Sequence, residues 1–213
     1  MKLALFGATG PTGKHLIEEA LKQGHSLSVY TRDAQKLEAF AGKVEVVVGD
    51  LQNREAILNC VRGADAVISA LGPNSLKIQG ERPVTQGLSN IIAAMRQSDI
   101  RRIIQISTAS YRDPKDGFDF KTHTYVFLIK LLLRKAYDDI KAAGNLVARS
   151  DLDWTLVRIP NLKDGPATGQ LDVGWYGRDK LSMQLSRGNL ATFLINQVAD
   201  KTFMRAAPGI ANH

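Results

Sequence analysis

The sequence predicts an α/β fold: a single domain built on a doubly wound, mostly parallel sheet with helices on both faces. The chain starts with a complete βαβ unit, in which a strand at Lys2–Phe6 is followed by a helix at Lys14–Lys22 and a second strand at Ser26–Tyr30. Short apolar runs then alternate with helical segments along the rest of the chain. With 213 residues, 44% of them hydrophobic, the chain suits one full core, so we expect residues 1–213 to form one domain.

A glycine-rich turn joins the first strand to the first helix, with the sequence Gly7-Ala8-Thr9-Gly10-Pro11-Thr12-Gly13. Gly7 permits the tight turn, Gly10 lets the backbone approach a pyrophosphate, and Gly13 lets the helix pack closely against the sheet. The N–H groups that start the helix would hold the phosphates, together with the hydroxyls of Thr9 and Thr12. The motif predicts a dinucleotide site; the alternative is a tight turn that binds nothing.

Arg32 follows the second predicted strand and favours NADP(H) over NAD(H) as the cofactor. An acidic residue near this position binds the ribose 2′-hydroxyl of NAD(H), whereas an arginine accommodates the 2′-phosphate of NADP(H). Asp33 comes one position late for the acidic role. The alternative is that Arg32 only begins a short helix and faces water.

Composition and charge limit the classes of partner. The chain has 28 Lys and Arg against 21 Asp and Glu, a net charge of +7, but the basic residues are spread along it. We therefore expect a small-molecule partner and no nucleic acid. No segment approaches the ~18 uninterrupted apolar residues of a membrane span, so we expect no membrane partner. The single cysteine, Cys60, and an N-terminus without a signal-peptide layout fit a cytoplasmic protein, either a monomer or a homodimer.

The remaining elements follow from apolar periodicity and turn residues. Further strands are expected at Lys43–Val48, Ala66–Leu71, Ile100–Ile106 and Asp153–Arg158, with a short strand at Lys180–Leu185 and a last edge strand at Phe203–Gly209. Further helices are expected at Asp33–Phe40, Asn53–Val61, Pro83–Gln97, Tyr125–Arg149 in two parts, and Leu190–Val198. Gly165–Gly177 is expected to be a loop, and Ser186 or Asn189 to cap the last helix.

The carboxyl ends of parallel strands meet at one edge of a sheet, and ligands of open α/β sheets lie beyond that edge. Asp50 and Leu51 follow the third strand, so we expect them to reach the adenine. Ala70, Leu71 and Gly72 come at the end of the fourth strand, so we expect them to border the ribose and the nicotinamide.

Three side chains are candidates for catalysis. Thr108 comes just after the fifth strand, where it can reach the nicotinamide. Tyr137 and Lys141 are four residues apart, on one face of a predicted helix. A neighbouring ammonium lowers the pKa of a tyrosine hydroxyl, which can then donate a proton to a carbonyl that is being reduced, while the lysine holds the cofactor ribose. The alternative is a structural pair, or a lysine that only orients the cofactor.

Several motifs together resemble the atypical short-chain dehydrogenases: Gly7–Gly13, Arg32-Asp33, Gly49-Asp50-Leu51, Ser107-Thr108-Ala109 and Ser150–Arg158. The closest group is similar to biliverdin IXβ reductase and flavin reductase, with the NmrA-like proteins as wider relatives. The resemblance covers nearly the whole chain. Its most specific parts are the glycine motif and the stretch Ser-Asp-Leu-Asp-Trp-Thr-Leu-Val-Arg.

The resemblance implies a Rossmann fold that binds NADPH and reduces a flavin or a similar planar conjugated acceptor. It places Thr108 near the nicotinamide and adds four cofactor contacts, at Ser107, Pro160, Asn161 and Leu162. The biliverdin-reducing relatives have a histidine at the position of Asn161, so the acceptor stays open. They also do not use a Tyr-x-x-x-Lys pair, so the proton comes either from Tyr137 or from solvent. The substrate region is expected within residues 108–185.

Two functions remain open from the sequence. One is an NADPH-dependent reductase; the other is an NADP(H)-sensing regulator of the NmrA-like type, which binds the cofactor without turnover. The apolar run Tyr125–Leu133 is a core helix, a lid over the substrate or a dimer contact. Trp154 is expected in the core, while Trp175 and Tyr176 either stack on a planar substrate or pack on the surface. His123 and the other three histidines have no ligand spacing, so no metal site is expected.

Overall fold

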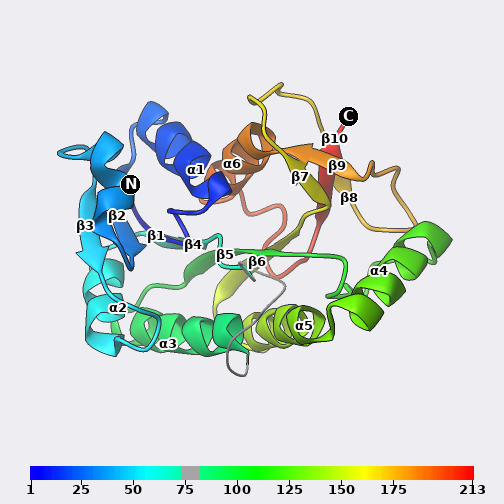
Figure 1. Ribbon diagram of the computed structural model, residues 1–213, viewed down its shortest axis with the longest axis horizontal. Coiled ribbons are helices and arrows are strands. Elements are labelled where there is room, and N and C mark those ends of the chain that lie inside the picture. Colours follow the sequence, from blue (N-terminus) through cyan, green and yellow to red (C-terminus); the bar gives the residue numbers. More distant parts are fainter. Residues whose placement is uncertain (73–81) are drawn as a thin grey trace.

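The computed structural model describes residues 1–72 and 82–213, and within them eight strands form one sheet in the order β3-β2-β1-β4-β5-β6-β10-β8 (Figure 1). Neighbouring strands are parallel except for β10 and β8, which are antiparallel. The strands are β1 (Lys2–Phe6), β2 (Ser26–Thr31), β3 (Glu45–Val48), β4 (Ala66–Ser69), β5 (Arg102–Ser107), β6 (Asp153–Arg158), β8 (Leu171–Gly174) and β10 (Gly209–Asn212). Two short strands, β7 (Asn161–Lys163) and β9 (Gln184–Ser186), pair separately.

Helices cover both faces of the sheet (Figure 1). One face carries α1 (Pro11–Lys22), α6 (Arg187–Asn196) and the 3₁₀ helix η1 (Ala34–Phe40), and the other carries α2 (Arg54–Val61), α3 (Pro83–Gln97) and α5 (Arg134–Ala148). Each face has its own cluster of buried apolar side chains, with the strands between them. The doubly wound, mostly parallel α/β fold is confirmed.

The central strands explain why the sheet is buried on both sides. Every residue of β4, Ala66–Ser69, is buried, as are Ile103 and Ile104 of β5. Such continuous apolar runs, rather than alternating ones, are typical of parallel strands that are covered by helices on both faces. Trp154 is 7% exposed and belongs to the core, as expected, and Cys60 is fully buried beside Ser28.

A buried carboxylate joins α5 to the start of α3. Asp139 is fully buried, and it accepts hydrogen bonds from the backbone N–H groups of Val84 and Thr85, at 3.0 and 2.9 Å. It also accepts one from the Thr85 hydroxyl at 2.6 Å. Because the first N–H groups of a helix lack partners within it, a side chain of α5 here caps α3. The contact fixes the position of α5, which forms part of the candidate site.

The C-terminal third differs from the expectation. Gly165–Gly177 is not all loop, because it contains β8, which forms the edge of the sheet. The edge strand predicted at Phe203–Gly209 is wrong both in its residues and in its place in the sheet. The observed strand β10 covers Gly209–Asn212 and lies between β6 and β8. The short strand β9 starts at Gln184 and pairs with β7 rather than with the main sheet. Ser186 caps the last helix, α6: its hydroxyl accepts a hydrogen bond from the N–H of Asn189 at 3.1 Å. Ser186 was one of the two expected caps.

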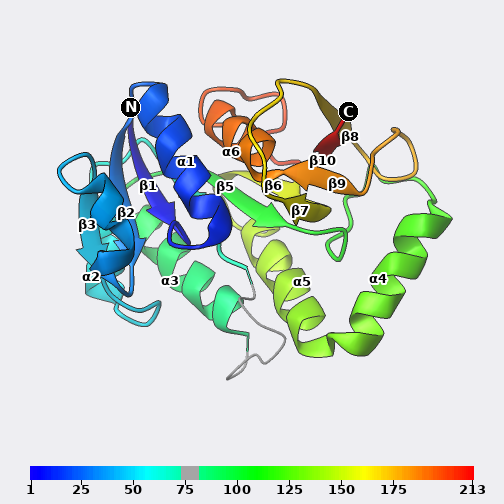
Figure 2. The same cartoon turned by 45° about the horizontal axis from the view of Figure 1, so that its top comes forward.

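The apolar run Tyr125–Leu133 does not form a core helix. Most of it belongs to α4 (Phe120–Leu132), in which no residue is buried. Figure 2 shows α4 meeting the N-terminal end of α5 at an angle, beyond the end of the sheet. Because α4 lies past the strands, only one of its faces meets the rest of the chain, and the core interpretation is wrong.

Candidate functional site

The glycine-rich turn lies at the carboxyl end of β1, between β1 and the start of α1. Gly7 has a φ of +79°, and a Cβ added there would lie 2.8 Å from the carbonyl group of Ala70. The turn is closed by hydrogen bonds from the N–H of Gly10 to the carbonyl of Gly7 and from the N–H of Gly13 to that of Gly10. Only glycine fits position 7, because both the left-handed backbone and the close contact exclude a side chain.

Three features of this edge fit a bound dinucleotide. The first helical turn, which starts at Pro11, has neither a side-chain cap nor an acidic residue, so its N–H groups can receive an anion. A Cβ at Gly10 would meet only the Gly7 carbonyl, at 3.4 Å, so the space above this residue is open. The buried Ser107 hydroxyl at the end of β5 has no partner among the described residues. Thr9 is exposed and Thr12 is 8% exposed.

Arg32 and Asp33 follow β2 and have different environments. The Asp33 carboxylate accepts a hydrogen bond from the N–H of Gln35 at 3.0 Å and so caps η1. Arg32 is exposed at the carboxyl end of β2. The acidic group is thus already engaged in a helix cap, while the guanidinium is free to face solvent or a ligand.

The ends of β3 and β4 place the other expected cofactor contacts. The Asp50 carboxylate accepts from the N–H groups of Gln52 and Asn53, at 2.8 and 3.0 Å, so it holds the turn into α2. Leu71 is fixed through its carbonyl, which accepts from the side-chain amide of Gln105 at 3.1 Å. Leu51, Ala70 and Gly72 are half-buried at the same edge.

A cavity of about 440 Å³ opens beside this edge, between α4, α5 and the residues that follow β5 and β6. Its wall is mostly apolar, and the polar groups are few. It is lined by Thr108, Ala109, Ser110, Thr122, Tyr125, Val126, Ile129, Leu133, Ala136, Ile140, Ile159, Pro160, Tyr176 and Met183. Mostly apolar walls with a few placed polar groups are typical of small-molecule sites.

Tyr125 is a site residue that the sequence did not reveal. Its hydroxyl donates a hydrogen bond to Oδ1 of Asn161 at 3.1 Å, and its side chain lines the cavity together with Thr108 and Pro160. Two of the expected contacts, Thr108 and Pro160, thus share the cavity wall with Tyr125, and Asn161 is joined to that wall through the Tyr125 hydroxyl. In the sequence, Tyr125 is only the first residue of an apolar run, and nothing local distinguishes it from a packing residue.

The Tyr137–Lys141 pair does not line the cavity of about 440 Å³. Tyr137 lines a smaller adjoining cavity of about 80 Å³, whose wall also includes Ser110, Asp116 and Asp119. Lys141 is exposed, and its Nζ lies 5.9 Å from the centroid of the Tyr137 ring, over the ring face. Lys130 of α4 lies at the same distance from that ring. The role of the pair stays a prediction.

A buried ion pair holds the loop that follows β5. Arg158 is fully buried, and its guanidinium donates two hydrogen bonds to the Asp116 carboxylate, at 2.6 and 2.8 Å. The same guanidinium lies 4.7 Å from the centroid of the Tyr176 ring. Burial raises the pKa of Tyr176 to about 12, so its phenol stays protonated in neutral solution. The loop that carries Ser110 is thus anchored to β6 behind the cavity.

Trp175 and Tyr176 have separate roles. Tyr176 is 9% exposed and borders both cavities, whereas Trp175 packs against Phe203 with ring centroids 6.1 Å apart. Among the described residues, no group of three or more His, Cys, Asp or Glu side chains is arranged to hold a metal ion. None of the helices in residues 1–72 and 82–213 is long and apolar enough to cross a bilayer.

The chain belongs to the NAD(P)H-binding family, whose model matches residues 7–201. The matched range covers the glycine turn and every strand from β2 to β9. The resemblance to the atypical short-chain dehydrogenases, which the motifs indicated, is thereby confirmed at the level of an NAD(P)H-binding Rossmann protein.

Individual relatives are distant. A 3-diazoavenalumate denitrifying reductase from Streptomyces is 29% identical over 192 residues, which cover 84% of this chain. The chain spans 60 to 64% of the length of this and two other curated relatives that it matches. An anaerobilin reductase from Escherichia coli has a similar fold, with a TM-score of 0.80 and 19% identity over 100% of this chain and 97% of that one. A short-chain dehydrogenase/reductase from Veillonella parvula, solved with NADP, also has a similar fold. Its TM-score is 0.75 and its identity 20%, and the match covers 99% of this chain and 94% of that one.

Proposed function

We propose that this protein is an NADPH-dependent reductase that transfers hydride to a planar conjugated acceptor, such as a flavin or a quinone. The position of the cavity is the main observation that supports this proposal. An apolar space of about 440 Å³ meets Thr108 and Pro160, the residues that follow β5 and β6 at the sheet edge beside the glycine turn. An acceptor in it would lie next to a nicotinamide bound at that edge. The names of two relatives, both reductases, support the same class of reaction.

The roles of the residues follow from their places. NADPH, when bound, supplies the hydride. The turn Gly7–Gly13 holds the pyrophosphate at the start of α1, and Arg32 pairs with the 2′-phosphate. Thr108 orients the nicotinamide, while the walls from α4 and α5 exclude water from the acceptor. A hydroxyl at the cavity wall donates the proton that accompanies the hydride, or solvent does.

Two tyrosines, Tyr125 and Tyr137, are candidates for the proton donor. Tyr125 borders the same cavity as Thr108, and its hydroxyl is held by Asn161. Tyr137 borders the smaller cavity beside Asp116 and Asp119. We favour Tyr125, because it lines the same cavity as Thr108 and Pro160, whereas Tyr137 lines the smaller one.

Arg32→Ala is expected to weaken NADPH binding by about 10- to 100-fold, because a hydrogen bond to a charged group contributes roughly 1.5–3 kcal/mol. NADH binding should be unchanged, since NADH has no 2′-phosphate for Arg32 to contact. Both dissociation constants can be measured by titrating the nicotinamide fluorescence. Arg62→Ala, at an exposed arginine after α2, is the matched control and should change neither. Equal losses for NADPH and NADH would contradict the assignment.

The reaction itself is tested by following NADPH oxidation with FMN, FAD, a quinone and biliverdin offered separately. We expect turnover with at least one acceptor. Thr108→Val should reduce it, and Tyr125→Phe should reduce it more than Tyr137→Phe, because positioned general acids contribute on the order of 10²–10⁴-fold. The two tyrosine variants are matched, since each removes one hydroxyl from a cavity wall and keeps the ring.

Each outcome of this assay has a distinct meaning. A loss confined to Tyr137→Phe would assign the proton to the Tyr137–Lys141 pair, and no loss in either variant would assign it to solvent. The exposed apolar side chains of α4, such as Phe127 and Leu131, also suit a sensor that binds another macromolecule. Absence of turnover with every acceptor, together with tight NADPH binding, would replace the reductase by that regulatory function.

A further inference from the structure

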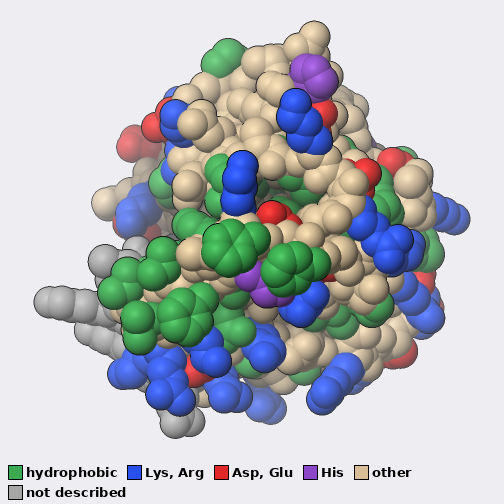
Figure 3. All heavy atoms as spheres, turned by 90° about the vertical axis from the view of Figure 1, so that its right-hand side faces the viewer, with side chains coloured by type: hydrophobic (Ala, Val, Ile, Leu, Met, Phe, Trp, Pro, Cys, Tyr) green, Lys and Arg blue, Asp and Glu red, His purple; other side chains and the backbone are tan. Residues whose placement is uncertain are grey.

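The outward side of α4 is a large exposed apolar surface, which we call the outer face of α4. Its members are Phe120, Phe127, Leu128, Leu131 and Leu132. Four of them have between 63% and 73% of their surface exposed, and Leu128 has 46%. In Figure 3, hydrophobic side chains gather on the side of the molecule that α4 forms. Phe118, just before the helix, is 76% exposed and extends the surface.

The outer face is not needed for the cavity. The cavity is lined by the opposite side of α4, through residues at helical spacing: Thr122, Tyr125, Val126 and Ile129. One side of the helix thus forms the candidate site, and the other side presents large apolar groups to solvent. Contiguous exposed apolar surfaces of this kind mark interaction sites in soluble chains.

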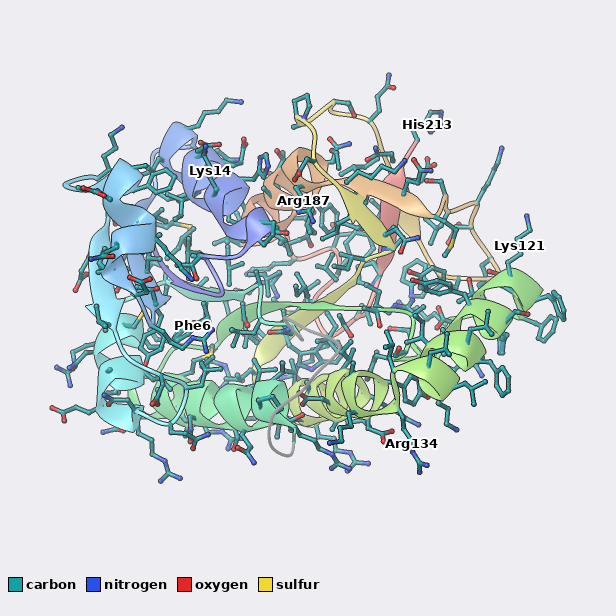
Figure 4. All side chains as sticks on the ribbon, viewed as in Figure 1. Phe6, Lys14, Lys121, Arg134, Arg187 and His213 are labelled. Atoms are coloured by element: carbon teal, nitrogen blue, oxygen red, sulfur yellow. The ribbon has the colours of Figure 1, made fainter. Side chains whose placement is uncertain are left out.

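Basic residues border the outer face. Lys121, Lys130, Arg134 and Lys135 are all exposed. No Asp or Glu occurs from Phe120 to Tyr137. Figure 4 shows Lys121 and Arg134 near opposite ends of α4, both pointing away from the body of the molecule. One acidic residue flanks each end of this stretch: the Asp119 carboxylate caps the start of α4 and accepts from the N–H of Lys121, and Asp138 lies 3.8 Å from Arg134.

We propose that the outer face of α4 docks this protein on an anionic lipid surface. Phe and Leu side chains of a helix enter the boundary between head groups and acyl chains, while neighbouring Lys and Arg pair with anionic head groups. Four exposed basic residues, Lys121, Lys130, Arg134 and Lys135, against two flanking carboxylates leave this border net positive, which is complementary to such a surface. A second copy of the chain fits less well, because a two-fold contact would bring the same basic residues of both copies together. The expectation of no membrane partner rested on the lack of a spanning segment in the sequence, and peripheral docking requires no such segment.

Co-sedimentation with lipid vesicles tests the proposal on the full chain. We expect binding to vesicles of phosphatidylglycerol and phosphatidylcholine and at least tenfold weaker binding to vesicles of phosphatidylcholine alone. Leu131→Gln should weaken binding to the anionic vesicles by about tenfold, because it removes one large apolar group from the buried surface. Lys130→Gln should weaken it about fivefold, the equivalent of one basic charge at an anionic surface.

Two variants at similarly exposed positions are the controls. Val48→Gln replaces a residue of β3 that is 54% exposed. Lys22→Gln removes a charge from α1, at a lysine whose side chain is 78% exposed. Neither should change vesicle binding. Thermal unfolding of Leu131→Gln should match that of the wild type, since no residue of α4 is buried.

Three results would overturn the proposal. The first is no binding of the wild type to anionic vesicles, and the second is equal binding to anionic and neutral vesicles. The third is a dimer in sedimentation equilibrium that Leu131→Gln converts to a monomer, which would assign the outer face to a second copy of the chain.

Discussion

Gly13→Ala is expected to lower the free energy of unfolding by at least about 3 kcal/mol, at the upper end of the cost of overpacking. A Cβ at this position would lie 1.9 Å from the carbonyl oxygen of Ala8 and 2.3 Å from its Cα. Both atoms belong to the backbone, so no side-chain rotation can relieve the contact. Either α1 moves away from the turn or the turn itself opens. For a chain of this size the Tm should fall by roughly 10 °C, measured by circular dichroism.

Gly10→Ala is the matched control, and it should separate folding from binding. A Cβ there meets only the Gly7 carbonyl, at 3.4 Å, and the backbone of Gly10 is extended, with a φ of −75°. The variant should therefore fold with a Tm near that of the wild type. Its NADPH binding should still weaken by about 10- to 100-fold, because the methyl group occupies the space where the pyrophosphate approaches. A Gly10→Ala protein that binds NADPH normally would contradict the placement of the pyrophosphate.

Asp116→Ala is expected to be the most damaging substitution outside the glycine turn. It leaves the Arg158 guanidinium, which is fully buried, without its bidentate partner. Removing one partner of a buried ion pair costs about 3–5 kcal/mol, because the remaining charge stays desolvated. Urea unfolding should show this as a lower midpoint, and the loop that carries Ser110 should lose its anchor to β6.

Two further variants test whether the burial of Arg158 causes the loss of stability in Asp116→Ala. Asp151→Ala breaks the Arg96–Asp151 pair, which is 2.7 Å long but exposed on both sides, and should leave the urea midpoint nearly unchanged. The double variant Asp116→Leu with Arg158→Met should be more stable than Asp116→Leu alone, since apolar side chains can replace a buried pair. A midpoint for Asp116→Ala equal to that for Asp151→Ala would mean that water reaches Arg158.

The N-terminal half could be predicted from the sequence because its signals are local. The glycines at positions 7, 10 and 13 each have a backbone requirement that neighbouring residues alone determine. The strands β1 and β4 are short, mostly apolar runs between turn residues, as expected for strands covered on both faces. The edge of the sheet at which the turn lies then follows from the parallel arrangement of the strands, whose carboxyl ends meet at one edge.

The C-terminal part and half of the candidate site depend on contacts between distant residues. Tyr125 becomes a site residue because α4 places it beside Asn161, 36 positions away. Asp116 and Arg158 are 42 positions apart, and neither stands out in the sequence as buried. The helix α4 was ambiguous because an apolar composition is the same for a core helix and for one that faces a cavity on one side. Only the position of α4 beyond the sheet distinguishes the two.

The absence of any buried residue in α4 has a consequence for which substitutions the candidate site tolerates. Substitutions at Thr122, Val126 or Ile129 would alter the wall of the cavity without replacing a member of either core cluster. The turn at Gly7–Gly13 is under the opposite constraint, since a single methyl group at position 13 collides with the backbone. The side of the candidate site that α4 forms is therefore far more tolerant of substitution than the glycine turn.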